Sequence, residues 1–370
     1  MARHSGEIMN KEFLGLALLS ALALTSCGGN PLPSSANSLS LAPTSSSSAH
    51  SETTSTTFIS ENASSSSDST VSTEGSSSAS NESSSSEESP VEESSSSLST
   101  SSETPSSEGL HYVFDEATKS ATVSSFDGTE TNVLIPASVN GYSVKAIGNS
   151  AFASQAKIVS VSLPVGLESI GDDAFNQAYA LKNINFPEGL LSIGEYAFFY
   201  APLTKIGLPS TVQTIDSLAF ASARSIASFS VDSSNPYFAS DDGRVLTSKD
   251  GTIVYFYAPN SGEEYSLKTG TTSLRDFSFY DNLILTDLAL PEGLTSIGDW
   301  ALAYLRGVTS LVLPRSLSSL GSWALAYDAK LTDLRFGGTR AEWTKVSASS
   351  SWNNGTSFTV IHCSDGDAAL

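Results

Sequence analysis

The sequence predicts a β-rich solenoid of the α/β type, in which short units coil in a right-handed sense and stack their strands into a parallel sheet. A fourteen-letter phrase recurs: "SLPVGLESIGDDAF" starts at residue 162, "NFPEGLLSIGEYAF" at 185 and "ALPEGLTSIGDWAL" at 289. The slot of its second glycine recurs in steps of 23, 23, 22, 59, 23 and 23 residues, at Gly148, Gly171, Gly194, Asp216, Arg275, Gly298 and Gly321. A register of this kind is typical of a stacked repeat protein.

One unit shows how the phrase would fold. Ile184 and Phe186 are two residues apart, the period of a strand with one buried face, and Asn183 and Asn185 alternate with them on the other face. A proline follows at once and ends the strand, because proline cannot donate to a ladder. The closing "AF" would fill the space between coils. No unit can bury these residues alone, so the repeated letters are expected to form one continuous core.

Two further positions carry structural expectations. Gly194 and its equivalents are expected to adopt a left-handed or tight backbone. The acidic residues just beyond them suit the start of a short helical turn, where free N–H groups favour negative charge; they are Asp172, Asp173, Glu195 and Asp299. Some units depart from the pattern: Asp216 and Arg275 replace the glycine, and Leu302 and Leu325 replace the phenylalanine.

The repeated spelling, LxxIxLPxxLxxIGxxAFxx, resembles the BspA-like (Treponema-type) leucine-rich repeats of bacterial surface proteins. The resemblance covers about residues 135–336, in about seven units of 22–23 residues. It implies a leucine-rich-repeat solenoid exposed on a bacterial cell surface. It also implies a partner among host matrix proteins, neighbouring bacteria and mucosal glycans, without choosing between them.

The first 27 residues are predicted to be a targeting segment. An apolar run of 12 residues, from Phe13 to Leu24, is too short to span a membrane but suits a signal peptide. The run ends in "LTSC", which resembles a bacterial lipobox and implies that Cys27 is acylated. A lipid-anchored protein of the cell envelope is therefore expected. A plain secretory signal with a stray cysteine is the alternative, and translation could start at Met1 or Met9.

Residues 28–108 are predicted to be a disordered tether. They contain 35 serines, no Lys or Arg, and 11 of the 39 acidic residues. They cannot bury enough apolar surface to offset the entropy of ordering. The remainder, 109–370, has 26 acidic and 16 basic residues. This balance argues against a nucleic-acid partner and against docking on anionic lipid, so any membrane contact is expected through the lipid anchor only.

Three parts of the folded region lie outside the plain repeats. Residues 109–135 alternate like strands and are expected to form an N-terminal β cap, and 337–370 are expected to form a C-terminal cap. Within the repeat region 136–336, an Asn140–Gly141 pair predicts a hairpin turn. A second insertion, at about 232–264, carries two Asp–Gly turns and is expected to bulge from the solenoid as a β-meander.

No catalytic, metal or cofactor site is predicted. His111 and His362 lie in opposite caps, and His362 and Cys363 would point to opposite faces of one strand. Carboxylates are paired in sequence at Asp172–Asp173, Asp241–Asp242 and Glu263–Glu264, and turns explain these pairs more simply than glycoside chemistry does. Weak calcium binding by residues 232–243 remains open.

The strand residues that alternate with the core are therefore the candidate binding site, on a face expected to be concave. They are Ser160, Ser162, Asn183, Asn185, Lys205, Ser228, Ser230, Asp287, Ser310, Asp333 and Arg335. The favoured function is binding of a macromolecule, either a protein or a glycan of the host or of neighbouring bacteria, without catalysis. Two alternatives remain: a secreted enzyme that acts on polysaccharide or protein, and a passive envelope component without a specific ligand.

Overall fold

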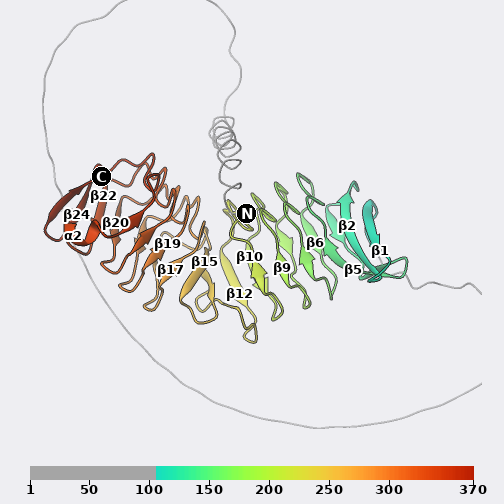
Figure 1. The fold of residues 1–370 in the computed structure, drawn as a ribbon. Coiled ribbons are helices and arrows are strands. Elements are labelled where there is room, and N and C mark those ends of the chain that lie inside the picture. The colour runs from blue at the N-terminus through green and yellow to red at the C-terminus, as the bar shows by residue number, and fades with distance from the viewer. Residues whose placement is uncertain (1–105) are drawn as a thin grey trace, which may run out of the picture. The chain divides into compact units, whose positions relative to one another are not determined.

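Residues 106–370 form a stack of short coils in the computed structural model, which describes this part of the chain (Figure 1). The stack has about 11 turns with a period near 23 residues and almost no helix, so the predicted fold class is confirmed. The seven spelled units are fewer than the turns because the end segments and the meander also contribute coils. Cys27, the signal segment and residues 28–105 of the expected tether lie outside the described residues.

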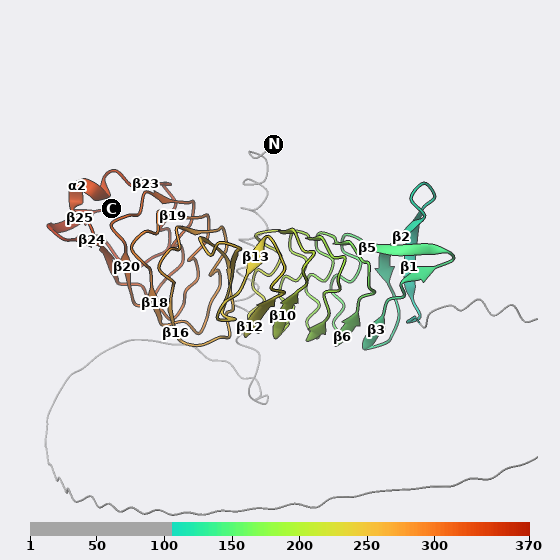
Figure 2. The same ribbon diagram turned by 90° about the horizontal axis from the view of Figure 1, so that it is seen from below.

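Each regular coil contributes two short strands. The first, which in six of ten cases runs into a proline, builds what we call the first-strand face: β3 (Asn132–Leu134), β6 (Ser160–Ser162), β8 (Asn183–Ile184), β10 (Lys205–Leu208), β12 (Ser228–Val231), β16 (Glu264–Ser266), β18 (Asp287–Ala289), β20 (Ser310–Leu313), β22 (Asp333–Phe336) and β24 (Val360–Cys363). The second precedes the glycine slot and builds the second-strand face: β7 (Ser169–Ile170), β9 (Ser192–Ile193), β11 (Thr214–Ile215), β17 (Ser273–Leu274), β19 (Ser296–Ile297), β21 (Ser319–Leu320) and β23 (Ser347–Ala348). Figure 2 shows the two faces along opposite sides of the stack.

Pairing between regular coils is parallel and keeps the sequence period. Ser160 lies opposite Asn183, and Ser296 lies opposite Ser319, each 23 residues on. The first-strand face contains four ladders, β3-β6-β8, β10-β12, β16-β18 and β20-β22-β24-β25. The second-strand face contains two, which run from β1 to β11 and from β13 to β23.

The "AF" phenylalanines stack on one another inside the solenoid. Phe152, Phe175 and Phe198 are fully buried, and the ring centroids of successive members are 5.0 and 5.2 Å apart with nearly parallel planes. Phe126 and Phe220 extend this column at its two ends. The expectation that phenylalanine fills the space between coils is confirmed, and each ring adds stacking to the apolar area that it buries.

The expected left-handed glycine is wrong for the repeated slot. Gly171 and Gly194 are not among the residues with positive φ. The reason for glycine is close approach: a Cβ on Gly194 would lie 2.4 Å from Oδ1 of Asp172 and 2.8 Å from its backbone nitrogen. Any larger residue would push the acidic side chain and the backbone of the preceding coil away.

The acidic residues after the glycine do not start helical turns either. Oδ1 of Asp172 accepts a hydrogen bond of 2.9 Å from the backbone N–H of Glu195 in the next coil, and Asp276 and Asp299 make the same contact with their successors. Glycine and acid thus work together, because the glycine leaves room for a carboxylate that satisfies a backbone donor. The left-handed residues lie just beyond, two in most coils, as at Asp173 and Gln177.

The meander is β13 (Phe238–Ala239), β14 (Val245–Ser248) and β15 (Ile253–Tyr257), joined by antiparallel pairs. It was expected to bulge, but β15 pairs in parallel with β17 and so belongs to the stack. Arg275 fills a glycine slot here because the preceding coil presents no acidic cap. Its guanidinium lies 4.8 Å from the ring centre of Tyr255 and donates to the backbone oxygen of Ile215 across the junction.

Both ends of the described stack carry antiparallel strands. At the N-terminal end, β1 (Leu110–Asp115) pairs with β2 (Ser120–Phe126), which runs parallel to β5 (Tyr142–Ile147). The hairpin of β4 (Ser138–Val139) and β5 turns at Asn140 and Gly141, both with positive φ, as predicted. The C-terminal end has α2 (Arg340–Trp343), β24 and β25 (Gly366–Ala369).

Candidate functional site

The structure brings the predicted strand residues onto one face. All of them lie in strands of the first-strand face except Asn185, which directly follows β8. Most are exposed, and those that are half-buried are Ser160, Ser228 and Asp333. Whether this face binds a partner is a separate question, taken up below.

The N-terminal part of this face, from β3 to β12, is neutral and hydrogen-bonded. The Ser160 hydroxyl donates to the Asn132 side chain at 2.6 Å, and the Asn185 amide bonds both the N–H and the carbonyl of Leu163. Lys205 is exposed and forms no ion pair with any described residue. The surface offers hydroxyl and amide groups with one unpaired cation.

The C-terminal part contains a charged cluster that sequence reasoning did not find. The Arg335 guanidinium pairs with Asp333 at 2.9 Å, and this hydrogen-bonded pair holds the pKa of the Asp333 carboxyl below its usual value. Ser310 donates to the same carboxylate, and a His362 nitrogen lies 3.9 Å from it. Arg335, unlike Lys205, is therefore an ion-paired cation.

Between β16 and β20 the face is acidic and partly apolar. Asp287, Glu263 and Glu264 are exposed, and none of them forms an ion pair with a described residue. Val312, 51% exposed, lines a shallow depression together with Ala289. The alternation of polar and apolar letters predicted Val312 at an outward position but gave no sign that a depression would form there.

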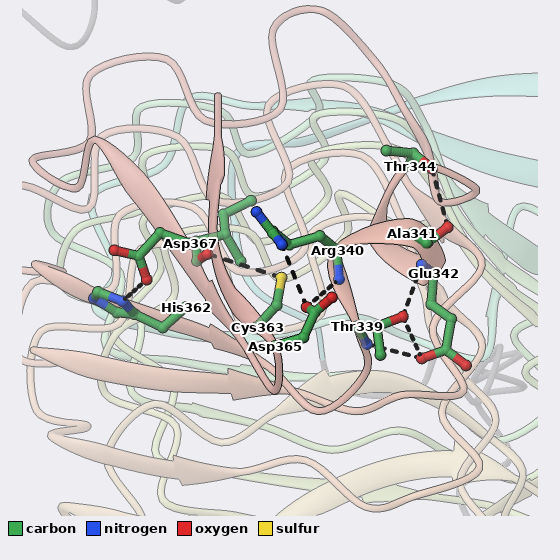
Figure 3. Close-up of polar contacts among 10 residues, drawn as sticks. Thr339, Arg340, Ala341, Glu342, Thr344, His362, Cys363, Asp365 and Asp367 are labelled. Atoms are coloured by element: carbon green, nitrogen blue, oxygen red, sulfur yellow. Dashed lines mark hydrogen bonds and ion pairs between the residues drawn. The ribbon is translucent and has the colours of Figure 1, made fainter.

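The C-terminal cap places His362 and Cys363 on different sides of β24 (Figure 3). The His362 ring bonds Asp367 at 2.7 Å, while the Cys363 sulfur is directed to the backbone oxygen of Ile361. Burial is the main cause that raises the pKa of the Cys363 thiol. This thiol is consequently not prepared as a nucleophile.

Nearby, Thr339 and Glu342 form a reciprocal capping box at the start of α2, and Asp365 accepts from the Arg340 backbone (Figure 3). These contacts connect the helix to the β24–β25 turn. The polar residues Thr339, Glu342 and Asp365 therefore have structural roles in the cap.

The two carboxylates of the Asp241–Asp242 pair have separate local partners. Asp241 pairs with Lys268, and Asp242 accepts from the Tyr265 hydroxyl. Within residues 106–370, no three His, Cys, Asp or Glu side chains are grouped so that they could hold a metal ion. In the same range, no helix has the length and apolar character needed to cross a membrane.

The two-strand coil, the glycine–acid contact and the 23-residue period together define a leucine-rich-repeat solenoid. Six copies of the BspA type leucine rich repeat region match residues 131–241 and 254–359. This is more than half of the chain, and the protein belongs to that family. No curated protein matches the chain.

Solved structures support the same architecture. The pneumococcal vaccine antigen PcpA is 26% identical, with a TM-score of 0.55 over 70% of this chain and 73% of that one. A leucine-rich repeat protein from Eubacterium ventriosum is 21% identical, with a TM-score of 0.50 over 62% of this chain and 71% of that one. The second likeness concerns the fold alone.

Proposed function

We propose that this protein is a bacterial cell-surface binding module that recognises a macromolecule through its first-strand face. One observation carries the proposal: polar side chains repeat in register along this face, from Ser160 to Arg335, without being used by the core. Extended faces of this kind are the surfaces that solenoids use for binding. The family to which the chain belongs supports an interaction module and not an enzyme.

We propose further that a lipid on Cys27 anchors the protein and that residues 28–108 act as its tether. The support is the apolar run followed by "LTSC" and the serine-rich composition of the segment. An acylated cysteine would supply more than one hydrocarbon chain, which stable membrane attachment requires. The folded part would then stand away from the envelope, where a protein or glycan of a host or of neighbouring bacteria could reach it.

The binding proposal is tested with charge reversal on the full chain. Lys205→Glu together with Arg335→Glu alters the two bases of the candidate site. Lys157→Glu with Lys330→Glu makes the same change in net charge at exposed lysines just before first strands. Each variant is measured against immobilised matrix proteins and mucin glycans. We expect the first pair to change the affinity for the partner so identified, with an effect on the association rate. Equal affinities for both pairs would contradict the proposal.

The anchor is tested by cell fractionation of Cys27→Ala. The parent should partition with membranes, and the variant should be released or remain as unprocessed precursor. Identical membrane partitioning, together with a parent mass that shows no lipid, would refute acylation of Cys27.

A further inference from the structure

The first-strand face has an open seam between β18 and β20. Neighbouring coils are joined on either side of it: Thr286 N donates to Glu263 O, and Thr332 N donates to Thr309 O. The corresponding bond from Thr309 N to Thr286 O is missing, and β18 and β20 belong to different ladders. The two strands still lie side by side in the stack, so the seam is a break in hydrogen bonding and not a gap between coils.

The depression described above lies on this seam. Its lining comes from β18, β20 and the residues just before them: Thr286, Asp287, Leu288, Ala289, Leu290, Thr309, Ser310 and Val312. Val312 is 51% exposed although its neighbours in the strand, Leu311 and Leu313, are fully buried. The seam therefore combines an exposed branched apolar side chain with a break in the backbone hydrogen bonds between coils.

Unpaired negative charge borders the seam on its β16–β18 side. Asp287 lies directly opposite Glu264 in the parallel register, and Glu263 precedes Glu264. The nearest arginine does not neutralise them: Arg244 donates to the backbone oxygen of Glu264 and lies 4.6 Å from the ring centre of Tyr265. On the β20–β22 side, Arg335 already pairs with Asp333. The field at the seam thus favours a cationic partner.

We propose that the seam binds an extended peptide segment in which lysine or arginine alternates with small apolar residues. The proposal rests on the function assigned above to the first-strand face and names the class of its partner. Apolar side chains of the segment pack on Val312 and Ala289, and its cationic side chains reach Asp287, Glu263 and Glu264.

A peptide fits these observations better than a glycan. A neutral glycan has no positive charge to pair with the three carboxylates, and a sulfated or sialylated glycan is repelled by them. The period of an extended peptide also matches the site, because alternate side chains point to one side and can place apolar groups on the seam. An anionic glycan would need a cation in the strands at the seam, and β16, β18 and β20 contain none.

The test uses the full chain and a fluorescein-labelled peptide of alternating lysine and valine. Binding is followed by fluorescence anisotropy at two salt concentrations, beside a glutamate–valine peptide and neutral and sulfated oligosaccharides. Two seam variants, Asp287→Lys and Val312→Asp, have matched controls at the far end of the same stack. Glu130→Lys makes the same charge change at an exposed acid, and Leu134→Asp alters an outward β3 residue that is 41% exposed.

We expect the lysine–valine peptide to bind the parent and both controls, and to bind each seam variant about tenfold more weakly. Added salt should weaken binding to the parent more than binding to Asp287→Lys. Equal loss in seam variants and controls, no binding to the parent, or an oligosaccharide whose binding depends on Asp287 and Val312 would overturn the proposal. Suppose that the partner identified with the Lys205 and Arg335 variants binds both seam variants as tightly as the parent. The first-strand face is then still the binding face, but the seam is not the binding site.

Discussion

The coil around Phe175 and the coil around Leu302 solve one packing problem in two ways. In the first, a fully buried phenylalanine fills the interior, and the left-handed position two residues before it holds Asp173. In the second, leucine is inside, and Trp300 holds the equivalent left-handed position at φ 57°. The aromatic ring thus lies in the interior of the first coil and in the outer turn of the second, while the backbone follows the same course in both.

The outer aromatic residues adopt an unfavourable backbone conformation, and their rings gain stacking contacts. Trp300, Tyr304, Trp323 and Tyr327 all have positive φ, which is unfavourable for bulky residues by about 1 kcal/mol or more each. The rings of Trp300 and Trp323 are nearly parallel with centroids 5.1 Å apart, and those of Tyr304 and Tyr327 are 4.8 Å apart. Both coils keep the close approach at the glycine slot, from Asn149 to Gly171 and from Asp276 to Gly298, while the location of their aromatic groups differs.

The largest expected effect comes from breaking the register. Deletion of residues 172–194 removes one period of 23 and leaves equivalent positions joined, so the remaining coils should stack. Deletion of 172–182 removes about half a coil and turns core residues outward, so the variant should not fold. Circular dichroism melts of both variants measure this, and a shared cooperative transition would contradict a solenoid with a fixed register.

Truncation of the inner column should cost more than truncation of the outer one. Phe175→Ala removes a fully buried ring between two stacked neighbours, and we expect a loss of about 3–5 kcal/mol in the free energy of unfolding. Trp323→Ala removes a half-buried ring, so the loss should be smaller, about 1–2 kcal/mol. Chemical denaturation compares the two, and an equal or reversed order would show that outer stacking holds the coils together.

The glycine slot should tolerate no side chain where an acid approaches it. Gly194→Ala should destabilise the protein by about 1–3 kcal/mol, because its Cβ would collide with Asp172. Gly207→Ala is the control: its Cβ would meet only the Ser230 hydroxyl, at 3.3 Å. If the two variants have the same stability, the close-approach explanation of the repeated glycine fails.

A smaller effect should depend on pH. Asp328 is 1% exposed and its Oδ2 has no hydrogen-bond partner, and burial raises its pKa well above the usual value. The folded state therefore holds a proton that the unfolded state releases, so stability falls as pH rises from the unfolded pKa of about 3.9 towards the raised folded one. Asp328→Asn should remove this fall, as pH-dependent denaturation would show. A parent and variant with parallel pH profiles would exclude Asp328 as its source.

The sequence was sufficient for the architecture because the core letters repeat at a fixed spacing. Ile184 and Phe186 report the strand and its buried side directly. The reason for Gly194 could not be read in the same way, since a left-handed backbone and a close contact both favour glycine. Only the position of Asp172 in the preceding coil separates them.

The candidate face was also predictable, but its chemistry was not. Alternation placed Arg335 and Asp333 outward correctly, yet the pair they form depends on side-chain rotamers. At the seam beside Val312 a hydrogen bond is missing between two coils whose sequences follow the ordinary repeat pattern. Neither feature leaves a trace in a single sequence.

We propose that the first-strand face, and not the coil as a whole, recognises the partner. Two exposed serines of that face on either side of β18, Ser266 and Ser310, are replaced by arginine, and the control replaces two exposed residues of the second-strand face, Thr214 and Ser347. Affinity for the matrix or mucin component that binds the full chain is then measured by surface plasmon resonance. We expect Ser266→Arg with Ser310→Arg to weaken binding about tenfold or more, while Thr214→Arg with Ser347→Arg leaves it unchanged. The reverse pattern, with loss only in the second pair, would contradict the claim.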